Sequence, residues 1–276
     1  IVPTILADVK GEECCGHGMG TFFPAYSSGE RTRSFLKVQD GCDYKCHYCT
    51  VPYARGESRN IPISEIIPQA EAIAAEGIKE IVLTGVNTGD FGRSTGETFF
   101  ELIKQLNDVE GIERYRISSI EPNLLTEEMI DWIVSGTKFL PHHHIPLQSG
   151  CDTILKEMGR RYDTAAFAHK IDYIRKHTEM PGGPKVFFGI DVIVGFPGET
   201  EEDFQELCEF LREARIERVG VFPYPPEEGP PAAEMPDRVD EETARRRAEL
   251  IMDMQAQIMD DYYASRIGQT LRVLCS

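Results

Sequence analysis

Three closely spaced cysteines are the residues of this sequence that point most directly to chemistry. Cys42, Cys46 and Cys49 stand at C-x3-C-x2-C spacing in one loop, just after the first predicted strand. Three thiolates placed in this way can ligate three irons of a 4Fe-4S cubane. The fourth iron then keeps an open coordination position, which can bind an exchangeable small molecule. The spacing therefore predicts an iron-sulfur cluster with one vacant corner.

A zinc site is the competing interpretation of the same loop. It requires a fourth ligand, for which His47 is the nearest candidate, and it would make the chain a zinc-binding scaffold module. The run 142–144 of three histidines also suggests a metal, but strand alternation sends His143 to the opposite face from its neighbours. Cys14 and Cys15 could form a redox pair, although adjacent cysteines bridge poorly.

The composition limits the possible partners. No apolar run approaches the roughly 18 residues of a membrane helix, and no secretion signal is visible, so we expect a cytoplasmic protein without a membrane partner. The net charge is −17, with 29 basic against 46 acidic residues, which excludes a generally basic nucleic-acid coat. A nucleic-acid partner would need another domain or a local basic patch. Such a patch comprises Arg31, Arg33, Lys37, Lys45, Arg55 and Arg59.

Alternating strands and helices are predicted to position these residues. The expected strands are 35–38, 80–84, 114–117, 143–147, 186–194 and 218–222, and the helices between them are 64–75, 99–107, 126–134, 153–158, 164–177 and 200–214. Such alternation predicts an α/β fold with a parallel sheet and right-handed crossovers. Six βα units fit the length better than eight, so we expect a partial (β/α)6 barrel with its site at the carboxyl ends of the strands.

The domain boundaries follow from composition. Residues 1–33 are predicted to be an N-terminal linker, and residues 34–236 the barrel core. The segment 223–236 is proline-dense and cannot form a central strand or helix. Residues 237–267 are predicted to contain a C-terminal helix, and residues 268–276 the first strand of a further β domain, so we expect truncation at both ends.

The cysteine loop resembles the signature of the radical S-adenosylmethionine (SAM) superfamily, and the motifs around it resemble the methylthiotransferases. In chain order these motifs are FLKVQDGC (35–42), CTVPYARG (49–56), LTGVN (83–87), ISSIEP (117–122), HIPLQSG (144–150) and GIDVIVGFPGE (189–199). The resemblance covers about residues 30–275. It implies a radical SAM barrel in which SAM chelates the open iron and is reductively cleaved to a 5′-deoxyadenosyl radical.

The resemblance also implies roles for individual residues near the strand ends. Cys42, Cys46 and Cys49 would hold the cluster and be catalytic. The implied cofactor contacts are Tyr48 beside the adenine, Thr84 and Gly85 at the SAM amino group, Ser118 and Glu121 at the ribose, Gln148 at SAM or substrate, and Asp191 and Ile193 in the strand supporting the adenine. Asp191 within an apolar strand is costly unless it is paired. Arg55, Arg59 and Ser149 are candidate substrate contacts.

Two groups of methylthiotransferases compete as the nearest resemblance. Residues 30–195 resemble the enzymes that modify threonylcarbamoyladenosine beside the tRNA anticodon, whereas residues 196–240 resemble those that thiomethylate a ribosomal-protein aspartate. Pro225 and Pro230 stand where both groups usually carry Ser and Thr, and they stiffen this loop. We favour tRNA as the substrate, with the ribosomal protein, or another radical SAM reaction, as the alternatives.

Further partners are implied by the same resemblance. The family carries a second 4Fe-4S cluster on an N-terminal domain, which we expect to lie outside this sequence. The chain alone would then cleave SAM but insert little sulfur. A reductant such as flavodoxin or ferredoxin and a sulfur donor are expected. An RNA-binding C-terminal domain, begun by Leu271–Leu274, could supply positive surface.

Overall fold

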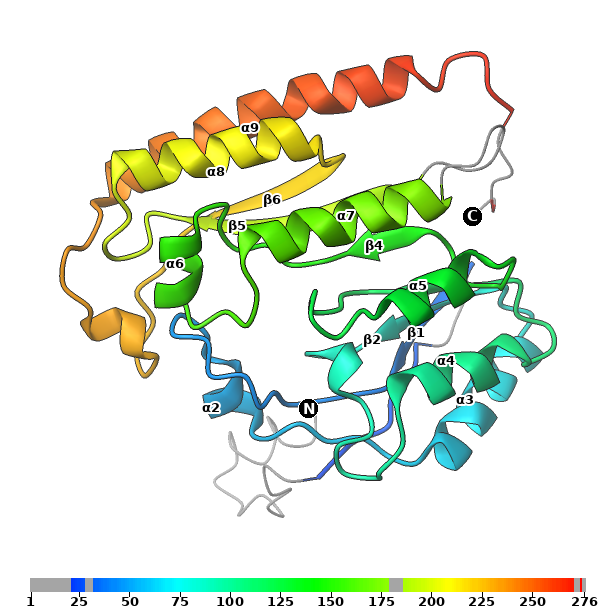
Figure 1. The fold of residues 1–276 in the computed structure, drawn as a ribbon. Helices are drawn as coiled ribbons and strands as arrows, with labels where there is room; N and C mark the ends of the chain where they lie inside the picture. The colour runs from blue at the N-terminus through cyan, green and yellow to red at the C-terminus, as the bar shows by residue number, and fades with distance from the viewer. Residues whose placement is uncertain (1–20, 28–31, 179–185, 271–273, 275–276) are drawn as a thin grey trace, which may run out of the picture.

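Six parallel strands form the scaffold of the chain. A computed structural model describes residues 21–27, 32–178, 186–270 and 274. The strands form two ladders, β1-β2-β3 and β4-β5-β6, each in chain order and each fully parallel (Figure 1). Their bounds are β1 (Arg33–Lys37), β2 (Glu80–Thr84), β3 (Arg114–Ile117), β4 (His142–His144), β5 (Phe187–Val194) and β6 (Arg218–Pro223). The α/β prediction with six parallel strands is therefore confirmed.

Helices connect the strands and cover one side of the sheet (Figure 1). Residues on that side alternate along each strand and are buried, as Leu36, Leu83, Tyr115 and Phe188 show. The helices are α2 (Val51–Arg55), α3 (Ile63–Ala75), α4 (Phe99–Asn107), α5 (Glu127–Val134), α6 (Asp152–Glu157), α7 (Thr164–Thr178), α8 (Glu201–Ala214) and α9 (Glu241–Ala264), with 3₁₀ turns η1 (Thr88–Asp90) and η2 (Pro231–Glu234).

The two ladders join through the backbone but do not close into a barrel. The Tyr115 amide donates to the Lys138 carbonyl at 2.8 Å, and the Ile120 amide donates to the His144 carbonyl at 3.1 Å. No pairing joins β1 to β6 within the described ranges. The free edge of β1 is instead met by the segment before it, where the Lys37 amide donates to the Ala25 carbonyl at 2.9 Å. Part of the predicted linker thus packs on the sheet.

Helix starts show where local sequence determines structure and where it does not. The Thr200 hydroxyl accepts from the Asp203 amide, and the Asp203 carboxylate accepts from the Thr200 amide, so a capping box starts α8 at the residue where the sequence predicts the helix to begin. The helix expected to start at residue 64 starts one residue earlier, without a cap from Ser64. The helix begins at Ile63, whose amide donates to the Glu97 carboxylate at 3.1 Å. A side chain distant in sequence supplies this cap, so no local pattern could reveal it.

The fourth strand is shorter than the predicted range 143–147, because Pro146 has no amide to donate. Beyond the proline, the Gln148 amide still donates to the Asp191 carbonyl at 2.8 Å. Helix α2 was not predicted. The strand predicted at the C-terminus, together with Cys14 and Cys15, lies outside the described residues. Within the described residues, no helix is both long and apolar enough to span a membrane.

Two glycines after β5 provide a matched test of the close packing between this loop and α9. Both have positive φ, but a Cβ on Gly195 would lie 2.5 Å from the Ala244 Cβ, whereas a Cβ on Gly198 would meet nothing within 4 Å. We expect Gly198→Ala to cost about 1 kcal/mol for the left-handed backbone. Gly195→Ala should cost about 1–3 kcal/mol more, because α9 must also shift. Urea unfolding of both variants measures the difference, and equal losses would contradict the packing.

Candidate active site at the cysteine loop

The three cysteines lie in one loop between β1 and α2. The Cys42 amide donates to the Gly56 carbonyl at 3.0 Å, and the Cys49 amide donates to the Cys46 carbonyl at 3.1 Å. Cys46 is buried and the other two are half-buried, and all three are free thiols. The far side of the loop is fixed by the His47 amide, which donates to the Met158 carbonyl at 3.0 Å.

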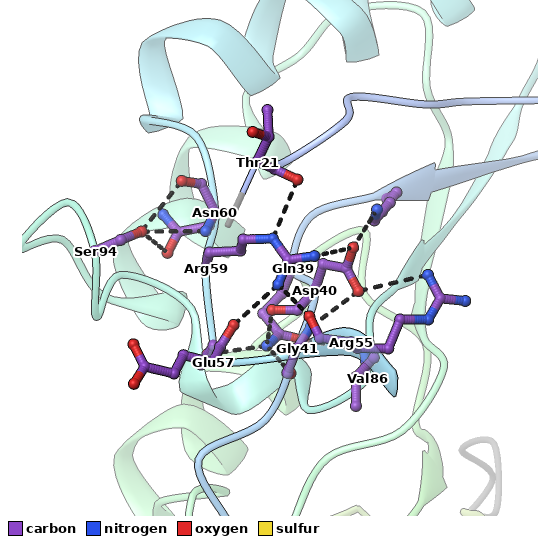
Figure 2. A network of polar contacts seen from close by, with 12 residues as sticks. Thr21, Gln39, Asp40, Gly41, Arg55, Glu57, Arg59, Asn60, Val86 and Ser94 are labelled. Atoms are coloured by element: carbon purple, nitrogen blue, oxygen red, sulfur yellow. Dashed lines mark hydrogen bonds and ion pairs between the residues drawn. The ribbon is translucent and has the colours of Figure 1, made fainter. Parts of the chain in front are cut away.

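Gln39 ties the start of this loop to the loop after β2 (Figure 2). Its side chain is fully buried. Its Oε1 accepts from the amides of Val86 and Asn87 at 2.9 and 2.8 Å. Its Nε2 donates to the Asp40 and Gly41 carbonyls at 2.9 and 2.7 Å, and lies 2.9 Å from the Ser58 hydroxyl. One side chain therefore sets the position of the cysteine loop relative to the end of β2.

Asp40 and Arg59 form a second brace of the loop (Figure 2). Arg59 pairs with Asp40 at 3.0 Å and donates to the carbonyls of Arg55 and Glu57 at 2.6 and 3.1 Å. Burial would raise the pKa of Asp40, but hydrogen bonds and the nearby cations hold it below its usual value. Because the Arg59 guanidinium is used within the protein, substrate contact by Arg59 is not favoured. Arg55 also pairs with Asp40, at 3.6 Å, but its side chain is 58% exposed.

Gly41 is required where this brace meets the cysteine loop. Its φ is +71°, and a Cβ there would lie 2.0 Å from the Glu57 carbonyl oxygen. Only glycine permits this close approach of two backbone segments directly before Cys42.

Arg160 is a site residue that sequence reasoning missed. Its Nη1 lies 3.1 Å from the Cys46 sulfur and 3.2 Å from the Tyr48 hydroxyl, and its Nη2 pairs with Glu121. Its side chain is only 2% exposed. Burial raises the pKa of Glu121, and Arg160 opposes that rise. Nothing in the local sequence around Arg160 distinguishes it from a surface arginine.

The site has thiols that could ligate a cluster and unpaired polar atoms that could bind SAM. Burial raises the pKa of Cys42 to about 11 and also raises the pKa of Cys49, so binding iron must displace protons from these thiols. Asn87 is buried with both its side-chain nitrogen and oxygen unpaired, and Asp90 has one buried unpaired oxygen. Asp90 also contributes to the raised pKa of Cys42. Buried polar groups without partners suit a polar ligand such as the amino acid portion of SAM.

The geometry around His47 bears on the zinc interpretation. The described ranges contain no group of three His, Cys, Asp or Glu side chains arranged to hold a single metal ion. The Nδ1 of His47 lies 2.6 Å from the carbonyl oxygen of Glu157 at the end of α6, which leaves its Nε2 as the ring nitrogen that a metal could use. His143 is buried, on the opposite face from His142 and His144, as strand alternation predicted.

Two predicted cofactor residues lie at the end of β2. The Thr84 carbonyl accepts from the Val38 amide at 2.9 Å, so its backbone belongs to the sheet. A Cβ on Gly85 would lie 3.0 Å from the Gln39 Oε1, which explains the glycine by close packing. The Ser118 amide donates to the Leu83 carbonyl at 3.0 Å, which places Ser118 beside this strand end.

The remaining predicted residues lie at the end of β5. Gln148 has φ +69°, a strained conformation for a residue other than glycine and one that is frequent at functional sites. The Asp191 carboxylate pairs with the His144 Nε2 at 3.2 Å. A partner of this kind was expected for a carboxylate in an apolar strand. Ile193 belongs to a small apolar cluster against which Tyr48 packs. Ser149 is buried and accepts from the Cys151 amide at 3.2 Å, which favours a structural role.

The proline-dense segment has a place in this arrangement. Ala232 and Met235 join the apolar cluster that contains Ile193, and the Ala232 amide donates to the His47 carbonyl at 2.9 Å. The segment therefore packs against the cysteine loop.

Comparison with known proteins agrees with this geometry. The radical SAM superfamily domain matches residues 36–211. The threonylcarbamoyladenosine tRNA methylthiotransferase MtaB of Bacillus subtilis (strain 168) is 40% identical over 253 residues, covering 91% of this chain and 54% of that protein. The ribosomal protein uS12 methylthiotransferase RimO of Pseudothermotoga lettingae is 37% identical over 243 residues, covering 87% and 55%. The chain thus spans about half the length of these curated relatives.

A solved structure shares the fold. Coproporphyrinogen III oxidase HemN from Escherichia coli superimposes with a TM-score of 0.57 at 13% identity, over 81% of this chain and 52% of that one. The parallel strands, the three-cysteine loop after β1 and the family match over residues 36–211 together show that this chain belongs to the radical SAM superfamily.

Proposed function

We propose that this chain is the catalytic core of a methylthiotransferase that acts on threonylcarbamoyladenosine in tRNA, next to the anticodon. The observation that carries the proposal is the cysteine loop, whose three free thiols are tied through Gln39 to the loop that holds the unpaired side chain of Asn87. A 4Fe-4S cluster held by Cys42, Cys46 and Cys49 would supply the electron that cleaves SAM. The similarity to methylthiotransferases over about nine-tenths of the chain supports the reaction class.

The residues of the chain would then bind and orient SAM. Asn87 and Asp90 can satisfy their unpaired atoms on its amino acid portion. Arg160 donates toward the Cys46 sulfur and pairs with Glu121, where it opposes the rise in the pKa of this carboxyl that burial causes. Ile193 and Tyr48 form an apolar wall suited to the adenine, and this wall excludes water from the reacting bond.

The choice of tRNA over the ribosomal protein as substrate rests on sequence similarity. A relative named for threonylcarbamoyladenosine in tRNA matches at 40% identity, and one named for ribosomal protein uS12 matches at 37%. A reductant, a sulfur donor and a second cluster on another domain belong to the same proposal.

The substrate is tested with the full-length protein that contains this chain. We expect deletion of its gene to abolish the methylthio group of threonylcarbamoyladenosine, as measured by mass spectrometry of digested tRNA. Complementation with a Cys46→Ala variant should not restore the modification. Loss of a thiomethyl group from ribosomal protein uS12 alone would reject the tRNA proposal in favour of the ribosomal protein.

The cluster is tested by removing one ligand. Cys46→Ala leaves two thiols, which cannot hold a cubane stably. After anaerobic reconstitution we expect the variant to lose most of its iron and sulfide and to release no 5′-deoxyadenosine under strong reductant. Cys208→Ala, at a buried thiol in α8, is the matched control and should keep both. A colourless wild-type protein containing zinc would support the scaffold alternative.

Arg160 is tested against its neighbour Arg161. Arg160→Gln leaves Glu121 buried without its cation, which raises the carboxyl pKa further and removes a donor to the Cys46 sulfur. We expect 5′-deoxyadenosine release to fall about tenfold or more, the effect of losing one charged hydrogen bond. Arg161→Gln, where the guanidinium is exposed and stacks on Tyr44, should stay near wild type. Equal release by Arg160→Gln and wild type, at equal iron content, would show that Arg160 is not needed.

A further inference from the structure

The sheet face that points away from the helices is rich in basic side chains. Strand residues alternate, so the neighbours of the core residues Tyr115 and Phe188 point to this inner face. The interior of a closed (β/α)8 barrel is filled mostly by branched aliphatic side chains. Here the alternate positions include Arg33, Arg114, Arg116, His142, His144 and Arg218. Only Glu80 and Asp191 are acidic among the strand residues of this face.

Two glycines on the inner face fit closely around its polar side chains. A Cβ on Gly220 would lie 2.5 Å from the Asp191 Oδ1, and a Cβ on Gly189 would lie 2.9 Å from the His144 Cδ2. Glycine at both positions therefore accommodates polar side chains on this face. Phe222, in the same alternation on β6, is 53% exposed. A face that combines an exposed apolar ring with basic side chains suits a ligand that is partly apolar and partly anionic.

Two polar nitrogens on the inner face are buried without partners. The Arg116 Nε and the His142 Nδ1 have no hydrogen-bond partner within the described residues. Arg116 reaches the Glu80 carboxylate only at 3.9 Å, and Arg114 shares that carboxylate at 4.0 Å, both longer than a hydrogen bond. Unsatisfied buried donors in a folded protein require an explanation, and a missing ligand is one.

Arg116 and His142 face the same side of two neighbouring segments, since the Tyr115 amide donates to the Lys138 carbonyl and the Ile120 amide donates to the His144 carbonyl. Burial lowers the pKa of His142 to about 4, and the charges of Arg116 and Arg218 lower it further. His142 is therefore neutral at physiological pH and offers one N–H. Its ring stacks on Phe187 with the centroids 5.6 Å apart, which fixes its orientation.

We propose that Arg116, His142 and Arg218 form a carboxylate-binding site on the inner face of the sheet, and that the site binds the carboxylate of the substrate's threonylcarbamoyl group. This inference rests on the proposed function. Guanidinium groups match carboxylates in geometry and charge, which favours this ligand over a neutral one. Arg116 lies two residues before Ser118, the predicted ribose contact, and strand alternation sends both to the inner face. Two strand residues span about 7 Å.

The same site would discriminate between modified adenosines. A substrate with an apolar group on N6 would leave the Arg116 and His142 donors buried and unpaired. Sites built to bond a polar group reject analogues that lack it more strongly than apolar pockets reject size variants. The carboxylate, and not the size of the modification, should therefore determine recognition.

The first experiment measures binding without any reaction. Threonylcarbamoyladenosine nucleoside and its methyl ester are titrated into the full-length protein, and binding is followed by calorimetry. We expect the acid to bind about tenfold to a hundredfold more tightly than the ester, the range of a charged hydrogen bond. Equal affinities would overturn the site.

The second experiment uses variants and a matched control. Arg116→Gln and Arg218→Gln should each reduce the preference for the acid by about tenfold and raise KM for the modified tRNA with little change in kcat, because the site lies away from the reacting atoms. Arg114 lies on the same strand and face as Arg116 and shares Glu80 with it, so Arg114→Gln is the matched control. This variant should keep the preference for the acid over the ester. Loss of preference in Arg114→Gln alone would overturn the assignment.

The two proposals fail in distinguishable ways. If the wild-type protein methylthiolates acid and ester substrates at equal rates, the function stands and the carboxylate site is rejected. If no methylthio product forms on any tRNA but the nucleoside acid binds more tightly than its ester, the site stands and the proposed function is rejected.

Discussion

The arrangement of the site depends on the buried amide of Gln39. A fully buried polar side chain is stable only when its donors and acceptor are satisfied, and here each of its two polar atoms has at least two partners. Those partners belong to three segments: the approach to Cys42, the turn after α2 and the loop after β2. Because the amides of Val86 and Asn87 are held by Gln39, the backbone of this loop is fixed while the Asn87 side chain remains unpaired. The protein thus separates a rigid backbone from a side chain kept available for a ligand.

The two faces of the sheet differ in the chemistry of their side chains and in their role. The outer face packs its alternating apolar residues against the helices and provides most of the buried area, as expected when the hydrophobic effect drives folding. The inner face bears paired and unpaired polar groups, including the His144–Asp191 contact of 3.2 Å. Glycines at 189 and 220 are required because these polar side chains occupy the space that a Cβ would take. Stability is therefore concentrated on one side of the strands, and the other side is left for chemistry.

Much of the scaffold was predictable because its signals are local. The strands 80–84 and 114–117 and the helix 99–107 have the bounds expected from their periodicity. The caps at Thr126 and Thr200 also follow from the residues beside them. The pairing of Asp191 followed from the cost of burying a charge, although its partner did not. Arg160 and the Glu97 cap of α3 escaped prediction because each acts on residues distant in sequence. Contacts of this kind depend on the three-dimensional fold, and the residue types alone do not specify them.

The strong acidity of the chain is compatible with an anionic substrate because charge is distributed unevenly over the fold. Helices α8 and α9 are predominantly acidic, and both pack on the outer side of the sheet. The cations Arg116 and Arg218 lie on the opposite face, and Arg55 projects from the turn after the cysteine loop. Between exposed charges, interactions are largely screened beyond about 8–10 Å at physiological salt, so the acidic helices repel a ligand on the inner face only weakly. The net charge of −17 therefore excludes a general affinity for nucleic acid, but it does not oppose a local contact with one carboxylate or phosphate.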